Sequence, residues 1–342
     1  MIIFNRPEKV NPLATDPLVY AKQIELYNEQ LHNSFQEGLG EEMNQLCRHC
    51  SVITVGSDAR YENWASRVEV VLLKGHDCEE GTLSALKDYI TSEERAKYFD
   101  PVVEVKELSS EKPLYKSFIP RENEEDLVLF SPYRLMEGKT LYGDPEILRE
   151  AKLLLAEELA IGKNRSTIKR IRNHVKAHAK VTETGAQEYG DNVLMHFDLK
   201  AGISYYDPEL QIWSFKQGPL RLVQYTLARD ITSILREIAQ EIPHDEIFSN
   251  DEVHQLMFLP QNTVSKLQKL QGMVYVVPSV QDMFDIMDSY VFFLKLYHIS
   301  QSHFISEGES VTEFSESKEI KERLEFLLDK CDRNVLLKRF EN

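Results

Sequence analysis

Hydrophobic and polar residues in the first half of the chain follow patterns typical of one long helix and of short buried strands. Apolar residues recur at three- and four-residue spacing between residues 17 and 49, which predicts an amphipathic helix. Residues 51 to 55 are rich in β-branched side chains and end at Gly56, so they predict a buried strand that leads into a tight turn. Residues 68 to 73 form a second run of this kind, which Gly75 ends.

The same two patterns continue as far as residue 145. A helical pattern covers residues 79 to 98, and apolar runs at residues 101 to 108 and 127 to 130 predict a third and a fourth strand. Strands interleaved with helices in this order are typical of an α/β or α+β sheet domain. We expect the α+β class, with the sheet domain spanning residues 17 to 145.

The composition changes after residue 145 and becomes that of a helical domain. Residues 203 to 215 fit either a small hairpin or an irregular loop. A chain of 342 residues is long enough for two hydrophobic cores, so we expect a second, mostly helical domain over residues 146 to 342. Its predicted helices cover residues 146 to 183, 219 to 240, 263 to 271 and 279 to 305.

The charge of the chain excludes some classes of partner. The formal net charge of −16 gives the protein a field that repels nucleic acid and anionic lipid, so any nucleotide must be held by local contacts. No run of about 18 apolar residues is present, and the first ten residues are charged too early to form a secretion signal. We expect a cytoplasmic protein that binds neither nucleic acid nor membrane.

The cysteines indicate reduced thiols rather than a disulfide framework. Four cysteines, at positions 47, 50, 78 and 331, are too few and too scattered to staple a chain of this size. Cys47 and Cys50 have the spacing of a metal knuckle, but no second pair of ligands follows them. We therefore interpret them as plain cysteines at the end of a helix.

The stretch from residue 55 to residue 73 carries the candidate chemistry. A strand that ends in Gly56 and Ser57, a polar turn and a second strand form a pattern that presents a nucleoside triphosphate. The glycine lets backbone amides approach phosphate oxygens closely, and the serine hydroxyl adds a donor. Carboxylates at alternate positions of the second strand share one face and can bind one divalent metal.

This stretch resembles the Gly-Ser … Asp-x-Asp signature of the polymerase-beta-like nucleotidyltransferase superfamily. The resemblance implies a nucleotidyltransferase-type mixed sheet followed by a helical domain, with Gly56, Ser57 and Arg60 at the triphosphate. More narrowly, the stretch resembles the bacterial uridylyltransferase/uridylyl-removing enzymes and their signal-transduction relatives. The residues that match this narrower pattern are Gly56, Ser57, Ala59, Arg60, Glu62 and Ser66.

The acidic part of the signature is incomplete. Where the family has Asp-x-Asp this chain has Arg67, Val68 and Glu69, and an arginine cannot coordinate Mg²⁺. The resemblance leaves Glu69 and Glu104 as the catalytic and metal-binding acids, with Mg²⁺ as the implied cofactor. Each acid has a simpler interpretation, Glu69 as a buried and partnered carboxylate and Glu104 as a charged residue of an edge strand. Because Arg67 brings a positive charge close to Glu69, we expect the two side chains either to face opposite sides of the strand or to pair. Positions two apart on a strand share a face, so pairing with each other or with another neighbour is the simpler outcome.

A weaker similarity continues into the second half of the chain. Lys216 and Arg221 flank a turn at residues 218 and 219 that leads into a helix. These two cations would either bind phosphate or dock the two domains together. With Arg134, which lies in another segment similar to the family, they are expected to line the domain interface.

Two classes of function remain open on these grounds. The first is an enzyme that binds a nucleoside triphosphate and transfers a nucleoside monophosphate to a hydroxyl of a protein or a small molecule. The second is a catalytically inactive regulatory or protein-binding module that keeps the fold and its nucleotide contact. The arginine at position 67 favours the second class, and Gly56, Ser57 and Arg60 favour nucleotide contact in both.

Overall fold

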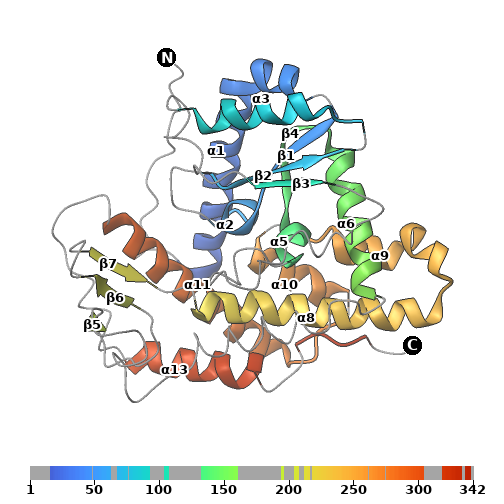
Figure 1. Ribbon diagram of the computed structural model, residues 1–342. Coiled ribbons are helices and arrows are strands. Elements are labelled where there is room, and N and C mark those ends of the chain that lie inside the picture. The colour runs from blue at the N-terminus through green and yellow to red at the C-terminus, as the bar shows by residue number, and fades with distance from the viewer. Residues whose placement is uncertain are drawn as a thin grey trace. The chain divides into compact units, whose positions relative to one another are not determined.

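The protein has an α+β fold of two compact units, each with a sheet of its own (Figure 1). The computed structural model describes residues 16–47, 49–62, 68–75, 77–92, 104–107, 132–160, 194–195, 204–207, 212–215, 218–260, 262–273, 275–303, 318–332 and 336–339. Unit 1 takes its described residues from Lys22–Arg165 and Leu235–Lys266, and unit 2 from Asn11–Ala21, Ser166–Ile234 and Leu267–Asn342. Both units are discontinuous along the chain, whereas the sequence predicts a single boundary near residue 145.

Unit 1 is built on a mixed sheet with the strand order β3-β2-β1-β4. Strand β1 (Cys50–Thr54) is antiparallel to β2 (Val70–Lys74) and to β4 (Lys139–Gly143), while β3 (Glu104–Glu107) runs parallel to β2. Every residue of β1 is buried, as expected for a central strand that is covered on both faces.

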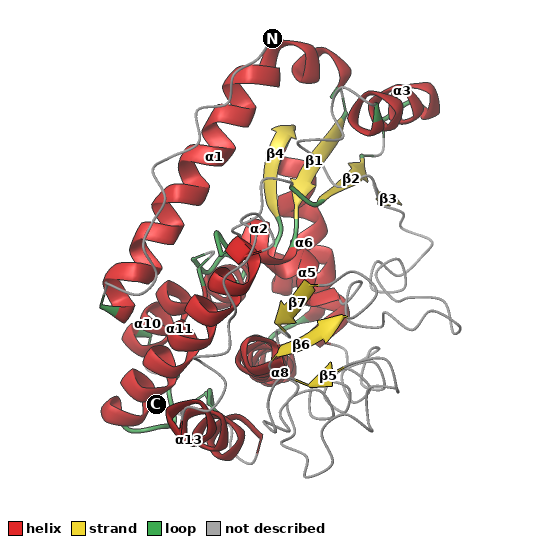
Figure 2. Cartoon of the chain, turned by 90° about the vertical axis from the view of Figure 1, so that its left-hand side faces the viewer, coloured by secondary structure: helices red, strands yellow, loops and turns green. Residues whose placement is uncertain are grey.

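Helices cover both faces of this sheet. Helix α1 (Pro17–Leu46) and helix α3 (Glu80–Thr91) place apolar side chains against one face, where Phe35 and Leu86 belong to one buried cluster with Val52 of β1. Figure 2 shows both helices beside the strands of this sheet. Helix α6 (Pro145–Ala160) packs against β1, β2 and β4, and its Leu148 lies beside Gly138 together with Ile53, the β1 residue that follows Val52. Neighbouring strand residues thus serve opposite faces, which is the period-two pattern that buries a sheet.

Four shorter helices complete the described part of unit 1. Helix α2 (Gly56–Ala59) follows β1 directly, and helix α5 (Pro132–Glu137) precedes β4. The 3-10 helix η2 (His244–Ser249) leads into helix α9 (Asp251–Met257), which packs against α6.

Unit 2 combines helices with a small antiparallel sheet. The sheet has the order β5-β6-β7, with β5 at Leu194–Met195, β6 at Ser204–Asp207 and β7 at Ile212–Phe215. The helices of the C-terminal part of the chain, some of which are shared with unit 1, are α8 (Gly218–Glu241), α10 (Thr263–Gly272), α11 (Val280–His303), α13 (Lys318–Leu327) and the π-helix η3 (Leu328–Asp332). The core of unit 2 includes Tyr20, whose hydroxyl lies 2.6 Å from Nδ1 of His298.

The first three predicted strands and most predicted helices are confirmed, with ends shifted by a few residues. A hairpin, not an irregular loop, occupies the described parts of residues 203 to 215. The predicted strand at residues 127 to 130 and the predicted helix beyond residue 160 lie outside the described residues. Strand β4 was missed, because residues 139 to 143 mix Lys139 and Thr140 with apolar side chains between two glycines.

The described helices contain no segment long and apolar enough to cross a membrane.

Candidate functional site

The predicted phosphate-binding turn lies where β1 ends and α2 begins. Val55 is extended, and Gly56 then adopts φ +64°, in the left-handed region that side chains with a Cβ rarely enter. A Cβ built on Gly56 would lie 3.6 Å from Nη2 of Arg134 and 3.7 Å from Oε2 of Glu69. The turn therefore needs glycine for its backbone conformation, and it brings a guanidinium and a carboxylate against the Gly56 backbone.

Glu69 and Arg134 form an ion pair beside this glycine. The pair joins Oε1 of Glu69 to Nη2 of Arg134, and the exposed fractions of the two side chains are 35% and 10%. Asp58 fixes the backbone at Glu69, since its Oδ2 accepts a hydrogen bond of 2.9 Å from the Glu69 amide. Glu69 is thus a partnered acid, and its cation comes from helix α5.

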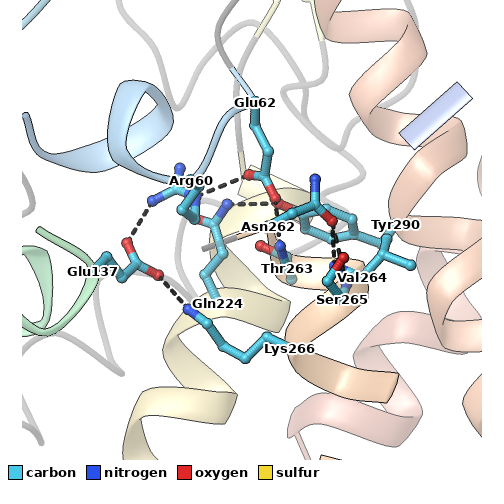
Figure 3. A network of polar contacts seen from close by, with 10 residues as sticks. All are labelled: Arg60, Glu62, Glu137, Gln224, Asn262, Thr263, Val264, Ser265, Lys266 and Tyr290. Carbon is cyan, nitrogen blue, oxygen red and sulfur yellow. Dashed lines mark hydrogen bonds and ion pairs between the residues drawn. The ribbon is translucent and has the colours of Figure 1, made fainter. Parts of the chain in front are cut away.

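Arg60 lies in a second, internal network (Figure 3). Its Nε donates to Oε2 of Glu62 at 2.8 Å, and its Nη1 donates to Oε2 of Glu137 at 2.6 Å. Glu137 is held on its other side by Nζ of Lys266, 3.4 Å from its Oε1. Arg60 is only 7% exposed and binds two carboxylates. Its guanidinium therefore links the segment that follows the Gly56 turn to helix α5.

The first turn of helix α10 joins the same network. Asn262 caps the helix, with its Oδ1 accepting from the amide of Val264 at 2.9 Å. The amide of Thr263 donates to Oε1 of Glu62 at 2.9 Å, so this carboxylate serves both Arg60 and a helix terminus. Glu62 is 1% exposed, which is tolerable for a carboxylate only with partners of this kind.

The charges around Glu137 keep it ionised. Burial raises the pKa of Glu137, but the neighbouring charges of Arg60 and Lys266 and their hydrogen bonds outweigh burial and leave the pKa below its ordinary value. Glu137 therefore stays ionised at neutral pH, and its contacts with Arg60 and Lys266 tie the C-terminal end of α2, helix α5 and the first turn of α10 together within unit 1.

The structure brings together part of the predicted site. Gly56 and Glu69 are in contact range, and Ser57 lies in the first turn of α2 with a partly exposed side chain. Glu104 lies in β3, opposite Val71 in the register of the parallel pair β2 and β3. Arg221 lies in α8, while Arg67 and Lys216 fall outside the described residues.

A magnesium site does not follow from the described residues. Among them no group of three or more histidine, cysteine, aspartate or glutamate side chains is arranged to hold a metal ion. Glu69 is paired with Arg134, and one oxygen of Asp58 accepts the amide of Glu69. Mg²⁺ prefers several unshared oxygens in octahedral geometry, so this set does not fit it as it stands.

Two residues of this site were not assigned to it from the sequence. The sequence places Arg134 at a domain interface, and Asp58 is not among the residues that match the Gly-Ser motif. Asp58 is 3% exposed, which the sequence does not reveal; an aspartate directly after the predicted phosphate turn is the signal that could have indicated a structural carboxylate there. In comparisons of the chain with protein-family models and with curated proteins, nothing matched.

Proposed function

We propose that this chain is a nucleotidyltransferase-like protein that binds the phosphates of a nucleoside triphosphate at the Gly56 turn and acts as a regulatory or protein-binding module. The observation that carries the proposal is the guanidinium of Arg134 lying against the backbone of Gly56, a glycine with positive φ. A guanidinium recognises phosphate oxygens through paired hydrogen bonds, and a glycine turn leaves room for them.

Binding would proceed by exchange of anions on Arg134. The Glu69 side chain is 35% exposed, and ion pairs with this much solvent contact contribute only up to about 1 kcal/mol. A triphosphate carries several negative charges and can therefore displace the Glu69 carboxylate from Arg134. Arg134 is 10% exposed and keeps its place, so the cation stays in position while Glu69 turns outwards.

The ion pair also favours binding over transfer. In the structure Glu69 neutralises Arg134 and does not stand as a free metal ligand. A carboxylate that prefers a guanidinium binds Mg²⁺ weakly, because the two cations compete for the same oxygens. The protein would then sense a nucleotide and pass that state to a protein partner.

Transfer of a nucleoside monophosphate to a protein or small-molecule hydroxyl is the second candidate. The register of the sheet favours transfer. Glu104 of β3 is opposite Val71 of the neighbouring strand β2, and Val71 is two residues beyond Glu69. If triphosphate binding frees Glu69 from Arg134, Glu69 and Glu104 are the acids that would hold Mg²⁺, which lowers the charge on the reacting phosphate. This candidate requires activity that depends on Mg²⁺ and is lost in Glu69→Ala.

The test is calorimetric titration of the full chain with ATP, GTP, CTP and UTP at up to millimolar concentration, with and without Mg²⁺. Arg134→Gln is expected to weaken binding about tenfold or more, since it removes a charged phosphate contact. Replacing Ser57 by Trp should weaken binding without unfolding the chain. Arg149→Gln is the matched control, because Arg149 is 52% exposed on α6 and lies outside the site.

The outcome decides between binding and its absence. Binding by the wild type that is lost in Arg134→Gln and kept in Arg149→Gln supports the proposal. Failure of the wild type to bind any nucleotide at millimolar concentration would end it. Transfer of labelled nucleotide, measured in the same samples, would favour the enzyme over the module.

A further inference from the structure

Helix α6 holds a buried lysine that the nucleotide proposal does not use. Lys152 is 4% exposed, and among the described residues no carboxylate forms an ion pair or hydrogen bond with it. Its ammonium lies 5.6 Å from the centre of the Phe258 ring, a contact that a cation favours. Burying a charged lysine without an anionic partner is energetically unfavourable, so the burial of Lys152 needs an explanation.

The described charged groups near Lys152 are mainly engaged with one another. Its charged neighbours are Lys266, which repels it, and Glu137, which attracts it. Glu137 already binds Arg60 and Lys266, and Glu62 binds Arg60. Among the described residues, Lys152 therefore has no carboxylate of its own in direct contact.

Burial has a measurable effect on this amine. It lowers the pKa of Lys152 to about 7; the charge of Lys266 adds to the fall and that of Glu137 opposes it. The amine is thus close to half protonated at neutral pH, and a nearby anion would draw the proton back onto it. Lys266 is 9% exposed, so both ammonium groups lie in surroundings that strengthen attraction to an anion.

We propose that Lys152 and Lys266 form a buried binding site for a phosphate group, which supplies Lys152 with an anionic partner. Two ammonium groups act as compact donors with three hydrogens each, and a tetrahedral phosphate offers oxygens in several directions to meet them. Phe258, whose ring lies beside the Lys152 ammonium, is 41% exposed to solvent. The site is centred on Lys152 and does not depend on nucleotide binding at Gly56.

The experiment measures thermal unfolding of the full chain in inorganic phosphate, with chloride at equal ionic strength as reference. The wild type is expected to unfold at a temperature that rises with phosphate concentration, because a ligand of the folded state stabilises it. Lys152→Met should lose this response, with phosphate affinity reduced about tenfold or more. Arg149→Gln removes the same charge from an exposed position of α6 and should respond like the wild type.

A second measurement uses the wild type alone and so does not depend on how a variant folds. Acetic anhydride transfers an acetyl group to a neutral lysine amine, and peptide mass spectrometry reads the rate at each lysine. Phosphate is expected to slow acetylation of Lys152 but not of Lys22, whose side chain is 61% exposed. Equal unfolding responses in wild type and Lys152→Met, or no protection of Lys152, would overturn the proposal.

The phosphate group could be free or part of a nucleotide, and competition separates these sources. If inorganic phosphate weakens ATP binding and Lys152→Met does the same, the site holds a phosphate of the bound nucleotide. If ATP binding is unaffected, or absent, while phosphate still protects Lys152, the site takes free phosphate or another phosphorylated ligand. The two proposals therefore fail separately.

Discussion

Acidification is predicted to destabilise unit 1 through one histidine of helix α1. His32 is 2% exposed, and neither of its ring nitrogens has a hydrogen-bond partner in the described part of the chain. Its ring packs on Tyr61, with 5.1 Å between ring centres, and the ammonium of Lys139 lies 4.3 Å from the centre of the Tyr61 ring. A proton added to His32 would thus be buried near a second positive charge.

The size of the effect follows from the pKa of His32. Burial, with a smaller contribution from the charge of Lys139, lowers this pKa to about 3, against 6.5 for a free histidine. The unfolded chain takes up the proton as the pH falls through 6.5, while the folded chain does not until about pH 3. The free energy of unfolding therefore decreases as the pH is lowered from 6.5 to 3. The decrease is at most about 5 kcal/mol, at 1.36 kcal/mol for each unit of pKa difference.

The assay is urea unfolding of wild type and His32→Phe at pH values from 7 to 4, followed by far-ultraviolet circular dichroism. Phenylalanine fills a similar volume and cannot take up a proton, so the free energy of unfolding of His32→Phe should fall less steeply with acidification. His49→Asn is the control, since His49 is exposed and Asn tolerates its φ of 60°. Parallel pH profiles for wild type and His32→Phe below pH 6.5 would refute the reasoning.

Two further predictions concern the backbone. Gly143→Ala should destabilise the chain by about 2 kcal/mol or more, because Gly143 has φ +84° and a new Cβ would lie 2.3 Å from the carbonyl oxygen of Cys50; urea unfolding measures this. Gly81→Ala, with nothing within 4 Å of the added carbon, is its control and should not destabilise the chain. Asn250→Ala should lower the free energy of unfolding by about 1 kcal/mol, because it removes a cap that accepts hydrogen bonds from two amides of α9 at 3.0 Å each. Asn250→Asp should retain most of this stabilisation. Equal losses in both variants would contradict the capping role.

Much of the sheet of unit 1 could be predicted from local pattern. Strands β1 and β2 are short apolar runs that end in a turn, and such runs can be recognised from the local sequence alone. Strand β4 does not, because it is recognisable only by its antiparallel partner β1, more than 80 residues earlier. The discontinuous make-up of the units was also out of reach, since it depends on contacts between distant segments.

The candidate site shows the same limit. Gly56 and Glu69 are close in sequence, and the prediction that Glu69 pairs with a cation is confirmed. The identity of that cation, Arg134, depends on how α5 packs and is not encoded in any local spacing. The Arg60–Glu62 pair could be predicted from its spacing, but its burial depends on Glu137, a residue 77 positions further along the chain.

The hydrogen bond between Glu62 and Thr263 has a consequence for the time at which unit 1 is completed during synthesis. The two residues are 201 positions apart, and the ribosome adds about 5 to 20 residues per second. The Gly56 turn therefore leaves the ribosome roughly 10 to 40 s before the amide that completes its carboxylate network. Until then the contacts of Arg60 with Glu62 and Glu137 lack Thr263 and Lys266. The polar network of unit 1 therefore stays incomplete until residues of the C-terminal half have been synthesised. A fragment that ends at residue 165 would remain permanently in this intermediate condition.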